Sequence, residues 1–234
     1  MSAEVLWGAV TRLGESGIVL PVVLVVAIGL GWTARRADRA LALLLPVAVA
    51  ATLVTATKIA FMGFGWGIAR IDFTGMSGHA MLAAAIYPVL VVVFIPPTEP
   101  RRALAMALAT VVVVLVVVSR VELDAHSPSE VLSGGAVGAL AARVAIRAIA
   151  HAGGTRLSLA WLAPALAWLL LTFPAPPVMP SHGWIAGLAM ALSGRDHPYV
   201  RADLYRDRRT RDRSAGEPWR PQPGAAPCVP VYTA

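Results

Sequence analysis

A histidine and a glutamate that lie four residues apart are the side chains of this sequence best suited to chemistry. His126 lies in the polar stretch 119–130, and Glu130 follows where Pro-Ser-Glu indicates the start of a helix. If that turn is helical, both side chains share one face, and the carboxylate holds one ring nitrogen of the histidine. The pair would then act as a nucleophile or base with its orienting partner. Arg120, in the same stretch, offers a planar fork that suits a phosphate or a carboxylate.

A second polar group surrounds the segment 61–76, which is rich in glycine and aromatic residues. Lys58, the only lysine of the chain, precedes the segment, and Ser77, Gly78 and His79 follow it. Glycine lets backbone N–H groups approach an anion, and a helix that begins here adds free donors and the positive end of its dipole. Together with Arg120, these groups predict an anion-binding pocket, and phosphate is the ligand that fits it best.

The composition indicates that these groups are positioned by membrane helices. The chain has 234 residues, of which 57% are hydrophobic and 14% are charged, and its mean hydropathy is +0.69. Such values are typical of an integral membrane protein. A single cysteine excludes an internal disulfide framework. Six apolar stretches are each near the roughly 20 residues that cross a bilayer, and they cover 16–34, 40–60, 78–97, 103–119, 131–150 and 157–174. The predicted fold is therefore all-α, a six-helix transmembrane bundle.

Arginines mark alternate connectors between these stretches. Arg35, Arg36 and Arg39 follow the first stretch, and Arg101 and Arg102 follow the third. Arg143, Arg147 and Arg156 lie at the end of the fifth stretch or just beyond it. The excess of positive charge in cytoplasmic loops places all of them inside, so the loops 61–77 and 120–130 would lie outside. We therefore expect a protein of the bacterial inner membrane whose site faces the periplasm. The same distribution explains the sequence pI of about 10.7 and argues against a nucleic-acid partner.

The sequence divides into three parts. Residues 1–15 predict an interfacial amphipathic helix, because their apolar side chains recur near helical spacing. Residues 16–193 form the membrane domain, whose last segment, 183–193, is too short for an ordinary span. Residues 194–234 are rich in Arg, Asp and Pro and predict a disordered tail. The arginines of this tail favour the cytoplasm, whereas six spans from an external N-terminus end outside, and the sequence leaves that conflict open.

The polar motifs resemble those of the type 2 phosphatidic acid phosphatase family over roughly residues 50–140. Ser-Gly-His at 77–79 and Ser-Arg-x5-His-x3-Glu at 119–130 are similar to its second and third signature motifs, and Lys58 is similar to the lysine of the first. Three positions depart from the family pattern. Met76 replaces a proline, Glu130 replaces an aspartate, and Gly65 stands where the first motif has an arginine, which Arg70 would replace from a longer loop.

The resemblance implies a phosphatase that acts on a lipid phosphate or diphosphate and needs no metal or other cofactor. His126 would attack phosphorus and form a phosphohistidine, Glu130 would orient its ring, and His79 would protonate the leaving oxygen. The phosphoryl oxygens would be held by Lys58, Arg70, Ser77, Gly78 and Arg120. Neither the particular lipid nor the oligomeric state follows from the sequence.

Three other functions fit parts of the pattern. A metal site built from the histidines with Asp72, Glu122, Asp124 and Glu130 matches no zinc spacing, and the neighbouring cations would repel a metal. A transporter or a non-catalytic anion-binding protein would place charge near the middle of the bilayer, whereas here it gathers at one end. A vanadate-dependent peroxidase shares the anion-binding constellation, but those proteins are soluble. The remaining histidines receive no functional role: His151, His182 and His197.

Overall fold

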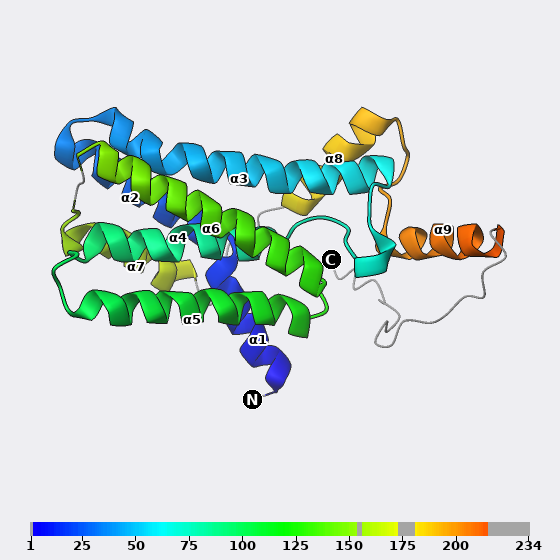
Figure 1. Cartoon of the computed structure of the whole chain (residues 1–234), viewed down its shortest axis with the longest axis horizontal. Coiled ribbons are helices and arrows are strands. Elements are labelled where there is room, and N and C mark those ends of the chain that lie inside the picture. The colour runs from blue at the N-terminus through cyan, green and yellow to red at the C-terminus, as the bar shows by residue number, and fades with distance from the viewer. Residues whose placement is uncertain (1, 154–155, 173–180, 215–234) are drawn as a thin grey trace.

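The computed structural model describes residues 2–153, 156–172 and 181–214, and the regular structure of this part of the chain is helical. Five helices lie along the long axis of the molecule (Figure 1), and they are α2 (Ser16–Ala34), α3 (Ala37–Phe64), α4 (Gly78–Phe94), α5 (Arg101–Glu122) and α6 (Pro128–His151). A shorter helix, α1 (Ala3–Thr11), precedes them and packs against α5. The predicted all-α class is confirmed.

The prediction of six full spans is supported only in part. Four helical segments are long and apolar enough to cross a membrane, namely 3–33, 37–64, 101–122 and 128–151. Helix α4 has 17 residues, which corresponds to about 25 Å and falls short of the roughly 30 Å bilayer core. It ends at Phe94 because two prolines follow at 96 and 97. Helix α7 (Leu162–Thr172) is shorter still.

Helix α4 is enclosed by protein, which explains how a short helix is accommodated. Every residue from Ala80 to Ile86 is buried. Helix α6 approaches it so closely that a Cβ atom added at Gly134 would meet the backbone of Ser77, and one at Gly138 would meet the backbone of Met81. Small residues spaced by four allow two membrane helices to pack backbone against backbone. This interface therefore holds the start of α4 beside the start of α6.

The arginine-bearing connectors gather at one end of the bundle. Arg39 Nε donates to the carbonyl of Ala152 at 3.0 Å, and the Leu157 amide donates to the carbonyl of Val93 at 3.1 Å. Because the helices alternate in direction, the loops 65–77 and 123–127 lie at the opposite end. The sequence predicted this segregation, whereas the membrane side that each end faces stays a prediction.

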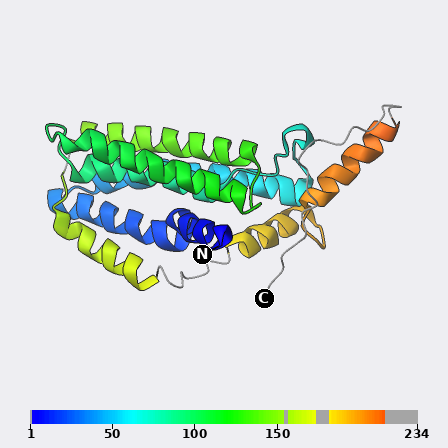
Figure 2. The ribbon, with the colours of Figure 1, turned by 90° about the horizontal axis from the view of Figure 1, so that it is seen from below.

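The C-terminal part of the chain returns to the end that carries these two loops. In α7, Trp168 Nε1 donates to the carbonyl of Gly17 at 3.0 Å, near the start of α2. Helices α8 (Ser181–Ser193) and α9 (Arg201–Ser214) then lie at the same end as the loop 65–77 (Figure 2). Residues 201–214 were predicted to belong to a disordered tail but form α9 instead. The rest of that tail, 215–234, lies outside the described residues.

A small apolar cluster explains why this part of the tail is ordered. The ring of Tyr199 packs edge-on against Phe61 at 5.4 Å between centroids, and its amide donates to the carbonyl of Met62 at 2.7 Å. Leu204 and Ala189 complete the cluster at the end of α3. We call residues 181–204 the C-terminal cover, because they pack over this end of the bundle.

Candidate active site

The histidine–glutamate pair that the spacing predicted is formed. His126 Nδ1 lies 2.7 Å from Glu130 Oε2, and the glutamate side chain is completely buried. An ionised carboxylate only accepts hydrogen bonds, so Nδ1 carries the proton and the lone pair is on Nε2. His126 itself borders a cavity at this end of the bundle. The pair therefore presents an unprotonated ring nitrogen beside an open space.

Local sequence explains how Glu130 reaches its partner. Ser127 is the N-cap of α6, with Pro128 at the first helical position, and Glu130 completes a capping box by accepting from the Ser127 amide at 3.2 Å. The other carboxylate oxygen accepts from the backbone amide and the hydroxyl of Thr74 at 2.7 and 2.5 Å. The glutamate thus connects the start of α6 to the loop before α4.

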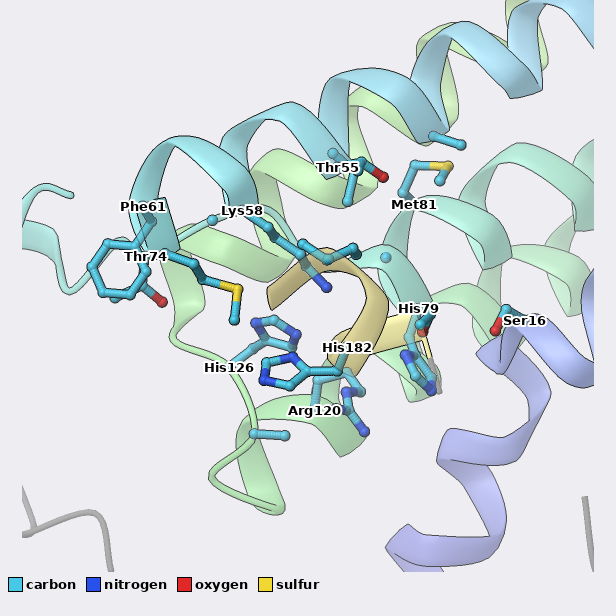
Figure 3. Close-up of a pocket in the computed structure, with 18 of the residues that line it drawn as sticks. Ser16, Thr55, Lys58, Phe61, Thr74, His79, Met81, Arg120, His126 and His182 are labelled. Atoms are coloured by element: carbon cyan, nitrogen blue, oxygen red, sulfur yellow. The ribbon is translucent and has the colours of Figure 1, made fainter. Parts of the chain in front are cut away.

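Four polar side chains that the sequence grouped on one face border the same cavity. Lys58 on α3, His79 on α4, Arg120 on α5 and His126 in the following loop turn toward one another (Figure 3). The cavity has a volume of about 540 Å³. Four separate segments of the chain therefore supply one site, as the alternating directions of the helices require.

Arg120 is held in a way that leaves a donor for an anion. Its Nη1 donates to Thr11 Oγ1 at 2.9 Å, so α1 helps to position it. Its Nε is buried and has no hydrogen-bond partner among the described residues. A buried unpaired donor is costly, and an oxyanion would satisfy it. Within the described ranges, no three His, Cys, Asp or Glu side chains gather as ligands for a metal.

Two residues that were predicted to bind phosphate do not border the cavity. Ser77 is fully buried as the N-cap of α4, where its hydroxyl accepts from the Ala80 amide at 3.5 Å. Its own amide donates to the Glu130 carbonyl at 3.0 Å, which ties the two helix starts together. Arg70 is exposed on a short 3₁₀ turn, η2 (Ala69–Ile71), outside the cavity lining. Gly78, by contrast, borders the cavity.

Three residues of the site were missed by the sequence analysis. Thr74 contacts Glu130 from a loop that was described only by its glycines and aromatics. His182 on α8 points toward the space between His126 and Arg120 (Figure 3). Arg201, at the start of α9, lies 2.9 Å from both oxygens of Glu130. No local motif marks the last two, because only the return of the chain brings them here.

The electrostatic surroundings keep His126 neutral. Burial lowers the pKa of His126 below its ordinary value, and the positive charges of Lys58 and Arg120 act in the same direction. The hydrogen bond and charge of Glu130 oppose that shift and raise the pKa. The net pKa of His126 is lowered, so its ring is neutral at neutral pH and Nε2 carries no proton. A neutral imidazole next to two cations has the charge distribution that a nucleophile toward an anionic phosphorus centre requires.

Comparison with known proteins identifies relatives of this arrangement. Residues 60–153 match the model of the PAP2 superfamily. Phosphatidylglycerophosphatase B of Bacillus subtilis (strain 168) is 31% identical over 147 residues, which are 58% of this chain and 70% of that protein. An uncharacterized 22.5 kDa protein in the cps region of Klebsiella pneumoniae is 29% identical over 206 residues, which are 86% of this chain and 98% of that protein.

A solved structure agrees with these sequence matches. The crystal structure of a transmembrane PAP2-type phosphatidylglycerolphosphate phosphatase from Bacillus subtilis superposes with a TM-score of 0.51 at 25% identity. The superposition covers 63% of this chain and 76% of that one. The family match ends at residue 153, so the C-terminal cover lies outside it.

Proposed function

The chain belongs to the PAP2 superfamily, whose members are phosphatases, and from this premise we propose that it hydrolyses a phosphate ester or diphosphate of a membrane lipid through a phosphohistidine. The observation that carries the proposal is the 2.7 Å contact between His126 Nδ1 and Glu130 at the edge of a cavity lined by Lys58 and Arg120. This contact directs the free ring nitrogen toward a place where a phosphoryl group would be held by positive charge.

In the first step, His126 Nε2 attacks phosphorus and forms an N–P bond while the bond from phosphorus to the lipid oxygen breaks. His79 donates a proton to that leaving oxygen, so the lipid departs as an alcohol or as a lipid monophosphate. Glu130 stabilises the positive charge that the ring acquires. The negative charge on the three equatorial oxygens is stabilised by Lys58, Arg120 and the backbone N–H at Gly78.

In the second step, water attacks phosphorus and the N–P bond breaks. His79, now without its proton, accepts one from the water, and inorganic phosphate is released. The ring of His126 returns to its neutral form, with Nδ1–H still donated to Glu130. Both steps use the same groups, and positioning and charge neutralisation supply the rate enhancement, as in other phosphoryl transfers.

The position of the cavity favours a lipid over a soluble phosphate ester. Its lining combines the cationic and histidine side chains with apolar residues of three membrane helices, including Leu20, Val54 and Leu82. A headgroup would therefore reach the polar groups while its chains remain in the bilayer. We place this end of the bundle at the periplasmic face, because the arginine-bearing connectors lie at the other end.

A panel of lipid substrates tests the proposal. Purified protein in detergent is incubated with phosphatidic acid, phosphatidylglycerol phosphate, a polyprenyl diphosphate and a lipid A phosphate, and released phosphate is measured. We expect turnover of at least one member and acid-labile phosphate trapped on the protein during that turnover. Folded protein that releases no phosphate from any of them would favour a non-catalytic anion-binding role instead.

A further inference from the structure

Arg201 stands between two anchored positions of the C-terminal cover. Immediately before it, the Tyr199 amide donates to the Met62 carbonyl at 2.7 Å, and the Val200 amide donates to Asp203 Oδ2 at 3.0 Å. Three residues after it, Leu204 is buried in the cluster at the end of α3. The backbone at 201 is therefore attached to the bundle on both sides, and the side chain is directed into the site rather than left free on the surface.

The guanidinium of Arg201 is committed to two carboxylates. Its Nη2 lies 2.9 Å from both oxygens of Glu130 and 3.2 Å from Thr74 Oγ1. Its Nη1 pairs with a carboxylate oxygen of Asp72 and lies 3.3 Å from the Asp72 carbonyl. Only 22% of the Arg201 side chain is exposed. Arg201 also borders the cavity, but both of its terminal nitrogens face carboxylates, so this arginine is placed to act on Glu130.

In the part of the chain that the structure describes, five donors surround the buried carboxylate of Glu130, and they are His126 Nδ1, the Ser127 amide, the Thr74 amide, the Thr74 hydroxyl and Arg201 Nη2. Arg201 is the only one of these with a permanent positive charge. An exposed ion pair contributes little, but the carboxylate here has no exposure at all, so the field of the arginine is weakly screened. That field weakens the attraction of Glu130 for a proton on the histidine ring.

We propose that Arg201 is a positioning residue for the reaction: it fixes the carboxylate of Glu130 and offsets part of its charge, so that His126 keeps an unprotonated Nε2 for attack. The inference rests on the proposed function and deepens it. It assigns a role in the site to the C-terminal cover, which lies beyond the part of the chain that matches the family.

The sign of the effect follows from the charges that face His126. Glu130 on α6 favours a protonated ring, and the positive charges of Lys58 on α3 and Arg120 on α5 oppose it. His79 on α4 and His182 on α8 are protonatable groups that border the same cavity, and Arg201 on α9 acts through Glu130. Asp72 in the loop before α4 contacts Arg201 and partly offsets it. Removal of Arg201 therefore raises the pKa of His126, and removal of the Asp72 charge lowers it.

The first test is a titration that does not depend on catalysis. The ring signals of isotopically labelled histidine are followed against pH in detergent-solubilised protein, and the His126→Gln variant identifies the signal of His126. We expect Arg201→Gln to raise the titration midpoint of His126 by about one pH unit. Arg201→Lys should raise this midpoint by less than half as much, and Asp72→Asn should lower it. Asn tolerates the left-handed backbone of Asp72 (φ 52°).

Arg206→Gln is the matched control on the same helix. Arg206 pairs with Asp203 at 3.2 Å, and its side chain is 75% exposed, so its removal is expected to leave the midpoint of His126 unchanged. If Arg201→Gln also leaves the midpoint unchanged while the protein stays folded, the inference is wrong. If Arg201→Gln fails to fold, the Asp72→Asn variant tests the inference instead. A titration midpoint of His126 that is unchanged or raised in Asp72→Asn would overturn the inference.

The second test measures the pH dependence of kcat/KM with the best substrate of the lipid panel. In the Arg201→Gln variant, the acid limb of the pH profile should move to higher pH by the same amount as the titration midpoint of His126. In the Arg201→Lys variant it should move by less than half as much. A purely structural role would lower kcat/KM at every pH and leave the limb in place, which would count against the inference. If wild-type protein hydrolyses no lipid, the proposed function fails, and the titration still decides whether Arg201 controls His126.

Discussion

Two interfaces build the site, and they differ in how they hold its residues. Helices α4 and α6 meet backbone against backbone along several turns, through Gly134, Gly138 and the buried alanines opposite them. The C-terminal cover is attached to the end of α3 by a cluster of five buried residues, which are Phe61, Met62, Ala189, Tyr199 and Leu204. The first interface is extended and leaves the two backbones little room to shift, whereas the second is confined to the end of α3.

This difference indicates that the two interfaces have different roles in the site. The α4–α6 interface holds His79 beside the His126–Glu130 pair, so it determines whether the chemistry can occur. The cover reaches the same pair through Arg201, which fixes the carboxylate of Glu130 and offsets part of its charge. Changes to the first interface should therefore affect turnover and stability together, and changes to the second should act mainly on pH dependence.

The largest effect is expected from His126→Ala, which removes the nucleophile. Among the described residues, no other histidine contacts Glu130, so phosphate release and acid-labile phosphate on the protein should both fall to background. His151→Ala is the matched control, because His151 is exposed at the far end of the bundle, where its ring lies 2.7 Å from the carbonyl of Arg147. Wild-type turnover in the His126→Ala variant would contradict the mechanism.

Glu130→Gln should have the next largest effect, because Glu130 lies in the first turn of α6 and also contacts Arg201 of the C-terminal cover. The amide would turn an N–H toward one of the donors that now face the carboxylate, which misorients the ring of His126. We expect kcat to fall by roughly 10²- to 10⁴-fold. Glu130→Asp keeps the charge but is shorter, so it should lie between that variant and wild type. Equal activity of the two variants in steady-state assays would refute the role of the charge.

Lys58→Met and Arg70→Gln compare a cation inside the cavity with one outside it. Lys58 borders the cavity, and loss of its charge should lower kcat/KM by about 10²- to 10³-fold. Arg70 is exposed on η2, so its charge is screened by solvent. Its replacement should change kcat/KM by less than about twofold. A large loss in Arg70→Gln would mean that the loop 65–77 moves during turnover.

Single methyl groups added at the two interfaces compare their contributions directly. A Cβ at Gly138 would meet the backbone of Met81 between α4 and α6, and a Cβ at Gly63 would lie 2.9 Å from the Ala189 carbonyl under the cover. Gly138→Ala should lower stability by about 1–3 kcal/mol and turnover with it. Gly63→Ala should instead shift the acid limb of kcat/KM in the direction of Arg201→Gln.

Thermal unfolding in detergent and pH profiles separate these two variants. Gly187→Ala is the control, because a Cβ at Gly187 on α8 has nothing within 4 Å. It should leave both the melting temperature and the pH profile as in wild type, or raise the melting temperature slightly. A loss of stability in Gly63→Ala as large as that in Gly138→Ala would show that the cover is part of the folding core.

Local sequence was sufficient for the part of the site that depends on short spacing and alternating helix direction. The interval of four residues between His126 and Glu130 and the N-terminal signal at Ser127 and Pro128 predicted a contact that the structure forms at 2.7 Å. Hydropathy predicted helices that bring Lys58 and Arg120 to one end. These predictions succeeded because a helix fixes the direction of each side chain, and a bilayer fixes the length and alternation of helices.

The same reasoning was less accurate where burial or a long return of the chain decides the outcome. A motif position does not reveal whether a side chain faces the cavity: Ser77, which was predicted to bind phosphate, is an N-cap in the interior, and that role stays a prediction. Hydropathy also predicted a span at 78–97, where the structure forms a 17-residue helix enclosed by protein, so the count of six spans stays a prediction.

By itself, the sequence determined the helical class, the pairing of His126 with Glu130 and the end of the bundle at which cationic residues gather. Only the tertiary structure decided that Arg201 completes the surroundings of Glu130, across a separation of 71 residues. The composition of the tail, rich in arginine and aspartate, predicts disorder when it is considered alone. The order of residues 201–214 depends on the packing of Tyr199 and Leu204 against an apolar surface at the end of α3. That surface exists only after the bundle has formed, and no local pattern in the tail encodes it.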